Sequence, residues 1–574
     1  MAAGVEREDE VEPGKRLIRV GDDRGLSLTE RLSYQISRLA WRTPFHSFRL
    51  RGRFPLKLLA VPKDPVAGDK AAGEAILHGA LLHRGNPFPI EELVFNAPDL
   101  PRELSDYLQS FEWLRDLSAA ATRERGARIA EQVVQKWLDT HAVEVSEPAW
   151  RADLWGRRIL FWAAYAPYIL SSRDPVYRSA VLNTLARGAR HLDKAAEKAP
   201  PGLARITAWA GVIAAALVVQ GGPARLSRGE AGMLRALSAS LHEDGGLFSR
   251  APVEQLALVE LLSQLRAVYI AGQADMPEAL SEALGGSVAA LLGVTLGDEA
   301  LSSWQGGNMV SRRRVAAAVE GSGIRARALR QPRGWGYQRL EAKKTVIVFD
   351  AAPPPPSRAL AGGCASTLAF EMSDGPVRIV VNCGGPGLCL TALPANLVQG
   401  LRTTAAHSTL TLGDRNSTAI HEDGTLGKGV GALELARDET GGVIQVEASH
   451  DGYVRRFGMV HQRRLTLSAD GRELRGEDIL LVEGKRRKDD LPFALRFHLG
   501  PDVEAATTAG GQGALLRVRG GGAWQFRCRG GQLSIEDSVF VDGEGRLHES
   551  AQLVLAGETP PDGLSIAWIF RRAG

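Results

Sequence analysis

Cysteine is scarce in this chain of 574 residues, which contains four: Cys364, Cys383, Cys389 and Cys528. No two of them form a C-x-x-C pair. A disulfide framework needs a dense, paired set of cysteines, so we expect buried, reduced thiols instead.

The chain also lacks a large charge of one sign and long apolar runs. Lys and Arg total 70 against 66 Asp and Glu, a formal charge of +4 that is too small over this length to indicate a nucleic-acid binder. No stretch reaches the run of about 20 apolar residues that a membrane helix needs. A hydrophobic share of 44% nevertheless predicts a large globular core.

The N-terminus has no basic segment followed by an apolar one. Residues 1–10 contain four acidic residues and one arginine, and the short apolar run at 17–20 ends at Gly21. We therefore expect no secretory signal and a cytoplasmic location. The phosphate-loop, G-x-S-x-G and H-E-x-x-H motifs are also missing, which excludes the commonest nucleotide-binding, serine-hydrolase and zinc-protease classes.

Apolar side chains recur with helical spacing before about residue 320. Ile129, Val133, Val134, Trp137 and Leu138 lie on one face of a predicted amphipathic helix. Similar patterns, separated by Gly, Pro and Asp, predict helices at about 28–41, 150–170, 175–197, 203–220, 227–242, 252–272 and 276–293.

After about residue 320 the pattern changes to a period of two. Runs such as 345–349, 377–381, 443–447 and 464–468 are bounded by Asp-Gly turns, and no helical segments separate them. This pattern predicts an antiparallel sandwich. We predict an N-terminal extension (1–100), an α-helical domain (101–318) and a β-sandwich domain (319–574).

Histidines in the β half are candidates for a metal site. His407 and His450 end or flank predicted strands, and Asp423 lies between them in a polar turn, so the three could bind a divalent ion. Scattered histidines in β-proteins also serve as hydrogen-bonding groups. Tyr453 is either a site residue or a sandwich tyrosine bonded to backbone, and Arg464 either guards the surface or lines a cleft.

These features together resemble the heparinase II/III family of polysaccharide lyases. The matching stretches are Ala-His-Ser-Thr-Leu at 406–410, Ser-His-Asp-Gly-Tyr at 449–453, Gly-Tyr-Gln-Arg-Leu at 336–340 and the D-G-G…R-x-P pattern at 244–252. The resemblance spans about residues 100–571.

The resemblance implies an incomplete (α/α) toroid followed by an antiparallel β-sandwich, with a cleft between them. It also implies cleavage of uronic-acid-containing polysaccharides by β-elimination, in which a base removes the proton next to the carboxylate. Family sandwiches often hold one structural Zn²⁺. By motif match, His407 falls on a ligand histidine of the family, and the resemblance leaves Asp423 and His450 as the remaining candidate ligands.

Two positions depart from the family pattern. Arg205 stands about where the family has an asparagine that neutralises the carboxylate, and Glu254 follows the R-x-P motif where the family has its catalytic tyrosine. Both are candidate catalytic residues. A glycoside hydrolase is a third possibility, for which Asp244 and Glu254 would be the carboxylates.

Two main hypotheses follow. In the first, the chain is a divergent lyase with Tyr453 or His407 as base, while Arg205, Arg250 or Arg402 binds the carboxylate, helped by Arg464. In the second, it binds an acidic glycan without cleaving it. The family is generally periplasmic or extracellular, whereas the N-terminus of this chain favours the cytoplasm. In the cytoplasm, the substrate would be a small oligosaccharide or an envelope precursor.

Overall fold

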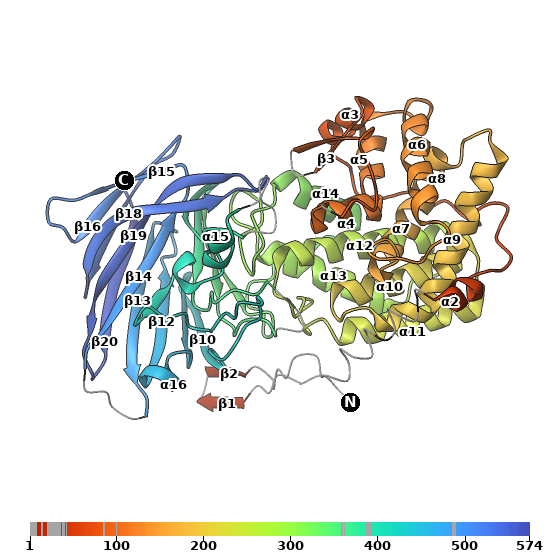
Figure 1. Ribbon diagram of the computed structural model, residues 1–574. Coiled ribbons are helices and arrows are strands. Elements are labelled where there is room, and N and C mark those ends of the chain that lie inside the picture. Colours follow the sequence, from red (N-terminus) through yellow and green to blue (C-terminus); the bar gives the residue numbers. More distant parts are fainter. Residues whose placement is uncertain are drawn as a thin grey trace.

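The protein is described by a computed structural model, which covers residues 9–12, 15–19, 36, 41, 43–83, 86–98, 100–356, 360, 362–385, 393–484 and 489–573. Figure 1 shows a helical half and a β half lying side by side. The helix predicted over 28–41 lies outside the described residues apart from Ile36 and Trp41, as does Cys389. The other three cysteines are free and buried, as expected.

The helical half contains most of the helices. They are α2 (Pro44–Arg49), α3 (Lys70–Leu77), α4 (Arg102–Ser110), α5 (Trp113–Ala120), α6 (Arg123–His141), α7 (Ala152–Ala164), α8 (Ala166–Ile169), α9 (Pro175–Ala195), η1 (Ala196–Lys198), α10 (Leu203–Ala214), η2 (Ala215–Val219), α11 (Pro223–Ser238), α12 (Pro252–Ala271), α13 (Glu278–Gly293) and α14 (Arg312–Ser322). No helix among the described residues has the length and apolar character needed to cross a bilayer.

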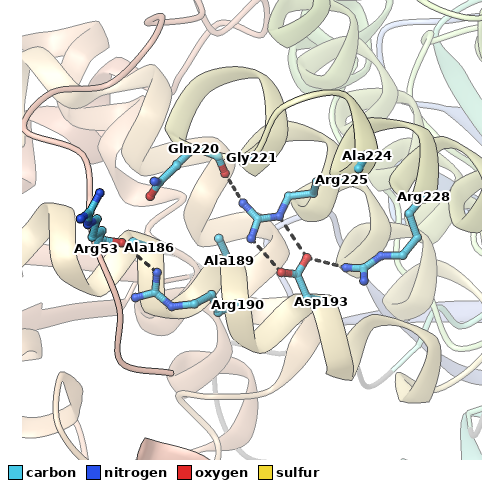
Figure 2. Close-up of a pocket in the computed structure, with 10 residues that line it drawn as sticks. All are labelled: Arg53, Ala186, Ala189, Arg190, Asp193, Gln220, Gly221, Ala224, Arg225 and Arg228. Carbon is cyan, nitrogen blue, oxygen red and sulfur yellow. Dashed lines mark hydrogen bonds and ion pairs between the residues drawn. The ribbon is translucent and has the colours of Figure 1, made fainter. Parts of the chain in front are cut away.

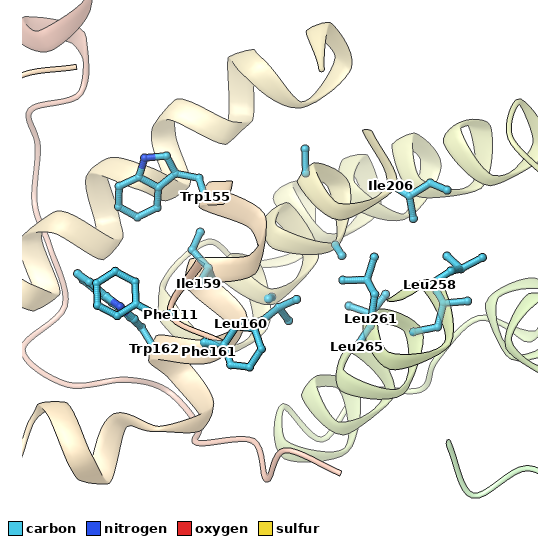
Figure 3. Packing of buried hydrophobic residues seen from close by; sticks show 14 of the residues in the cluster. Phe111, Trp155, Ile159, Leu160, Phe161, Trp162, Ile206, Leu258, Leu261 and Leu265 are labelled. Atoms are coloured by element: carbon cyan, nitrogen blue, oxygen red, sulfur yellow. The ribbon is translucent and has the colours of Figure 1, made fainter. Parts of the chain in front are cut away.

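Aromatic side chains fill the core of this half. Helix α7 is buried on nearly every face, and its Trp155, Phe161 and Trp162 belong to the same apolar cluster as Ile206 of α10 and Leu261 of α12 (Figure 3). Helices α7 and α10 cross at Gly156, where an added Cβ would lie 2.1 Å from the Thr207 carbonyl oxygen. That distance is far inside van der Waals contact, so only glycine permits this crossing.

The β half is a two-sheet antiparallel sandwich. Its larger sheet has the order β1-β2-β10-β11-β12-β13-β20-β17-β16-β15, and the smaller one β18-β19-β14-β8-β7-β6-β5, with β9 paired to β14. The strands of the larger sheet are β1 (Asp9–Glu12), β2 (Lys15–Arg19), β10 (Ala432–Thr440), β11 (Val443–His450), β12 (Met459–Leu467), β13 (Glu473–Val482), β15 (Val503–Thr507), β16 (Gly513–Val518), β17 (Ala523–Arg529) and β20 (Leu564–Arg572).

The remaining strands complete the second sheet and a small hairpin near the N-terminus. They are β3 (Ala80–His83), β4 (Asn86–Pro89), β5 (Tyr337–Ala342), β6 (Thr345–Asp350), β7 (Phe370–Asp374), β8 (Val377–Val381), β9 (Leu410–Leu412), β14 (Leu491–Leu499), β18 (Gln532–Val541) and β19 (Leu547–Thr559). Short helices α15 (Ala395–Gly400), η4 (Thr404–Ala406) and α16 (Val454–Phe457) lie in the connecting segments.

The first strands of the chain belong to the C-terminal sandwich. Strand β2 pairs with β10 in antiparallel register, with Ile18 opposite Leu433, and its Leu17 and Ile18 are buried. These strands precede the helical half in the sequence, yet they lie at the edge of the larger sheet beside β10 (Figure 1).

Buried polar contacts join the two halves. Asp244 accepts hydrogen bonds from the backbone of Gly334 and Trp335, and Gly246 packs directly on the Trp335 ring. Arg378 on β8 pairs with Asp298 at 2.8 Å. The D-G-G motif thus serves the junction between helices and sandwich, where Asp244 accepts backbone hydrogen bonds.

Glu371 makes the junction sensitive to pH. It is fully buried and accepts a hydrogen bond from the Ser303 amide at 3.1 Å. Burial raises its pKa from 4.5 to about 7, and Arg378 offsets only part of this effect. Between those two values the folded protein holds a proton that the unfolded chain has lost, so stability falls as the pH rises through this window.

We expect Glu371→Gln to reduce this loss of stability, because glutamine resembles the protonated acid. Melting temperatures measured across the window should decline less steeply in the variant than in the wild type. Part of the decline of melting temperature with pH should remain in the variant, since burial also raises the pKa of Asp116 to about 7. Equal slopes in the two proteins would contradict the role given to Glu371.

Candidate functional site

A cavity of about 1,100 Å³ opens at one end of the sandwich. It is lined by residues 415–421, 423 and 425–430, by residues 452, 453 and 455–457, and by the proline run at 354–356. We call it the β-side cleft. The proline run therefore forms part of its wall.

The loop that forms most of the cleft is a small irregular hairpin. The Ala419 amide donates a hydrogen bond to the Lys428 carbonyl, and the Gly427 amide donates one to the Ala419 carbonyl. Ile420 and Leu426 form an antiparallel bridge between the two sides of the hairpin. Gly429 lies very close to Thr418: a Cβ added to Gly429 would be 2.2 Å from the Thr418 Cα. The loop is therefore held in a defined shape at its base.

The opposite side of the cleft comes from the turn after β11. Asp451 accepts hydrogen bonds from the amides of Gly431 at 2.8 Å and Ala432 at 3.0 Å, which fixes this turn against β10. Helix α16 follows directly and ends at Gly458 in the left-handed conformation. The turn thus presents Arg455 and Arg456 at the cleft.

Four exposed cations line the cleft: Arg415, Lys428, Arg455 and Arg456. Within the described part of the chain, none of their side chains has a hydrogen-bond or ion-pair partner. Among the described residues of the lining, Asp423 is the single carboxylate, and it already accepts hydrogen bonds from Thr425 at 2.9 and 2.6 Å. The cleft therefore has an excess of three positive charges and suits an anionic ligand.

Sequence reasoning missed these four cations. Two of them form the pair Arg455-Arg456 directly after the Ser-His-Asp-Gly-Tyr stretch, so a scan for adjacent basic residues next to a predicted turn could have found them. Of the residues that the sequence did predict, Tyr453 and Asp423 line the cleft.

Tyr453 is not placed to act as a base. Its side chain is buried, and its hydroxyl donates a hydrogen bond to the Leu410 carbonyl at 2.8 Å. Burial raises the pKa of this hydroxyl well above its usual value. The alternative of an ordinary sandwich tyrosine bonded to backbone is therefore the one that the structure supports.

His407 is also enclosed by protein. Its Nδ1 lies 2.7 Å from the Thr403 carbonyl oxygen, and the side chain is 2% exposed. Burial lowers its pKa, so the ring is neutral at physiological pH. The hydrogen bond positions the ring against its own loop.

The two toroid candidates lie in separate places. Arg205, near the start of α10, donates from Nε to the Ala199 carbonyl at 2.9 Å. Glu254 lies in the first turn of α12 and is half-buried. Burial raises the pKa of Glu254, and nearby Ser249 and Arg157 offset only part of the effect. Neither lines the β-side cleft.

The three predicted substrate-binding arginines are all engaged within the protein. Arg250 pairs with Asp350 at 2.6 Å and donates to the carbonyls of Trp335 and Pro353. Arg402 donates to the carbonyls of Gly363 and Gly424, and Arg464 pairs across strands with Glu447 and Glu477. The prediction that they bind substrate is not supported by these contacts.

The predicted metal ligands do not converge. His450 accepts the Gly452 amide at Nδ1, Asp423 faces solvent with Thr425, and His407 is bonded to Thr403. Within the described ranges, no three His, Cys, Asp or Glu side chains are grouped so as to hold a metal ion. The residues present therefore do not fit the predicted site, and the Zn²⁺ itself stays an untested prediction.

Comparison with known proteins shows what the chain is similar to. The family model described as heparinase II/III-like, C-terminal, matches residues 324–569. Among solved structures, heparinase III aligns with a TM-score of 0.67 at 13% identity, over 96% of this chain and 92% of that one. Heparan sulfate lyase HepC from Pedobacter heparinus aligns with a TM-score of 0.58 at 14% identity, over 94% and 87%.

A curated relative matches over nearly its full length. FtsZ-localized protein C of Caulobacter vibrioides is 29% identical over 563 residues, which is 92% of each chain. The C-terminal part of this chain thus matches the heparinase II/III-like C-terminal model, and the fold is an (α/α) toroid followed by an antiparallel β-sandwich, as predicted. The likeness to the solved lyases, at 13 and 14% identity, concerns the fold.

Proposed function

We propose that this chain is a non-catalytic binding protein on the heparinase II/III fold, and that it binds an acidic glycan in the β-side cleft. One observation carries the proposal: the cleft presents four cations without partners in the described structure, whereas the predicted base beside them, Tyr453, is buried and bonded to backbone. The site can therefore attract an anion, while the hydroxyl of its predicted base is engaged with backbone.

The lining of the cleft matches the chemistry of an acidic sugar. Guanidinium groups bind carboxylates and sulfates through paired hydrogen bonds. The ring of Phe457 and the proline run provide apolar surface on which sugar rings can pack. An oligosaccharide carrying two or three acidic groups would neutralise the excess charge.

The binding test uses the double variant Arg455→Gln/Arg456→Gln. We expect it to bind a sulfated uronate tetrasaccharide at least about tenfold more weakly than the wild type in calorimetry, since two charge-assisted contacts of about 1 kcal/mol each are lost. Wild-type affinity should also fall as salt is added.

The matched control is Arg517→Gln/Arg527→Gln. These arginines are exposed on β16 and β17, outside the cleft lining, and their replacement changes the net charge by the same amount. The control should bind like the wild type. Equal loss in both variants would indicate a general charge effect and contradict binding in the cleft.

Lyase activity remains a second candidate because of Glu254. It stands where the family has its catalytic tyrosine, and burial raises its pKa, which brings a carboxyl group closer to the range useful for a general base. In this alternative Glu254→Gln would abolish turnover. The cleavage would be β-elimination of a uronate-containing glycan.

The full-length relative supports a proposal about where the protein works. Because that relative is named as FtsZ-localized, we propose that this chain also acts beside FtsZ, in the cytoplasm. Its acidic ligand would then be a small oligosaccharide or an envelope precursor. A fluorescent fusion should co-localise with FtsZ in the native host, and a diffuse signal at all stages of division would contradict this part of the proposal.

A further inference from the structure

A second cavity, of about 580 Å³, lies in the helical half, away from the sandwich. It is bounded by α9, by the end of η2, by the first turn of α11, and by Arg53 from the segment before α3. Figure 2 shows Arg53 and Arg190 on one side and Arg225 and Arg228 on the other. We call this cavity the Arg pocket.

The Arg pocket has more cations than it can neutralise. Asp193 is the single carboxylate that the described residues contribute, and both of its oxygens accept hydrogen bonds. Arg225 donates to them from Nε at 3.1 Å and Nη2 at 2.7 Å, and Arg228 donates from Nη2 at 2.5 Å. Four arginines against one aspartate leave an excess of three positive charges.

Arg190 has an unused donor in this pocket. Its Nε donates to the Leu50 carbonyl at 2.7 Å and its Nη1 to the Arg53 carbonyl at 3.1 Å. Its Nη2 is buried and has no hydrogen-bond partner in the described part of the protein. A buried, unpaired donor of a charged group is costly unless a ligand or solvent pairs with it.

The pocket also has room for a ligand. The residues between the two pairs of arginines are small, among them Ala186, Ala189 and Gly221. Burial lowers the pKa of Arg190, and repulsion from the nearby charge of Arg225 lowers it further. A bound anion would relieve that repulsion.

We propose that the Arg pocket binds the phosphate groups of a small soluble ligand of the diphosphate class. Guanidinium forks match phosphate oxygens in pairs, and a diphosphate carries about three negative charges at neutral pH, equal to the excess in the pocket. The pairs Arg53/Arg190 and Arg225/Arg228 would each hold one phosphate. This site is separate from the acidic-glycan site proposed for the sandwich.

The test measures binding of inorganic pyrophosphate to the full chain by calorimetry. We expect saturable binding to the wild type, and at least about tenfold weaker binding to Arg53→Gln/Arg228→Gln. These two side chains are exposed or at the rim, so their loss should leave the fold intact. Pyrophosphate should also raise the melting temperature of the wild type and not that of the variant.

Two controls make the assignment specific. Arg235→Gln removes an exposed arginine from the same helix, α11, outside the pocket, and should bind pyrophosphate like the wild type. The cleft variant Arg455→Gln/Arg456→Gln should also retain pyrophosphate binding. Absence of saturable binding to the wild type, or its loss in the cleft variant, would overturn the proposal. Orthophosphate and sulfate should bind more weakly than pyrophosphate, and equal affinities would contradict the diphosphate class.

Discussion

Replacing Asp478 by alanine is expected to lower the free energy of unfolding of the sandwich by about 3–5 kcal/mol. This carboxylate is fully buried and lies within 2.7 Å of His461 and 2.8 Å of Arg463, while Trp568 donates to it at 2.7 Å. Burial alone would raise its pKa, but Arg463 and His461 outweigh burial and hold the pKa at about 2. Without Asp478, the buried Arg463 has no counter-ion.

Chemical denaturation followed by tryptophan fluorescence measures this effect. Asp478→Asn should cost less than alanine, because the amide oxygen can still accept a hydrogen bond. The exposed Asp537→Ala on β18 is the control and should change stability by about 0.5 kcal/mol or less. If Asp478→Ala were as mild as the control, the buried charge cluster could not be a main support of the sandwich.

Arg250→Met is expected to cost a similar amount, about 3–5 kcal/mol, because it leaves Asp350 buried without its cation. Arg250 is 3% exposed and Asp350 is fully buried. The arginine also donates to the Trp335 and Pro353 carbonyls, and the Tyr337 hydroxyl donates to the Arg250 carbonyl at 2.7 Å. These contacts join the toroid to the sandwich, so the effect should be on stability.

The control for Arg250→Met is Arg464→Met, a change of the same size at another predicted substrate-binding arginine. Arg464 is 38% exposed and pairs with acids on its neighbouring strands, so its loss should cost about 1 kcal/mol or less. Glycan affinity measured at a temperature where both variants are folded should match the wild type. A specific loss of glycan binding in Arg250→Met would restore its predicted role in the ligand site.

Hydrophobic periodicity predicted the helices and strands well, because burial of one face is a local property of the sequence. Helix α9 with η1 covers 175–198 against the predicted 175–197, and Asp174 caps its start by accepting the Val176 amide. Helix α11 begins at Pro223, four residues before its predicted start, because Gly222 and Pro223 form its first turn. Helix α11 ends at Ser238, and the following residues form an antiparallel bridge between Leu241 and Leu247.

The candidate site was harder to predict because its character depends on long-range contacts. The hydroxyl of Tyr453 is bonded to Leu410, 43 residues away, and no local pattern reveals that acceptor. Arg250 and Arg402 carry the charge that a substrate site needs, yet each is engaged with distant backbone. The usable cations at the cleft are those that the fold leaves unpaired.

The N-terminal hairpin could not be foreseen for the same reason. Residues 15–19 pair with residues 432–436, so the partner strand is more than 400 residues away. The alternation of apolar and polar residues in so short a strand does not show which other strand it pairs with. Only the assembled sandwich provides the free edge of β10 that β2 covers.

The central claim is that the protein binds acidic glycans without cleaving them. The most direct measurement incubates the wild type with a panel of uronate-containing oligosaccharides and follows binding and the absorbance of unsaturated uronate in the same samples. We predict saturable binding of at least one member with no rise in absorbance. A rise in absorbance that Glu254→Gln abolishes would contradict the claim and establish a lyase.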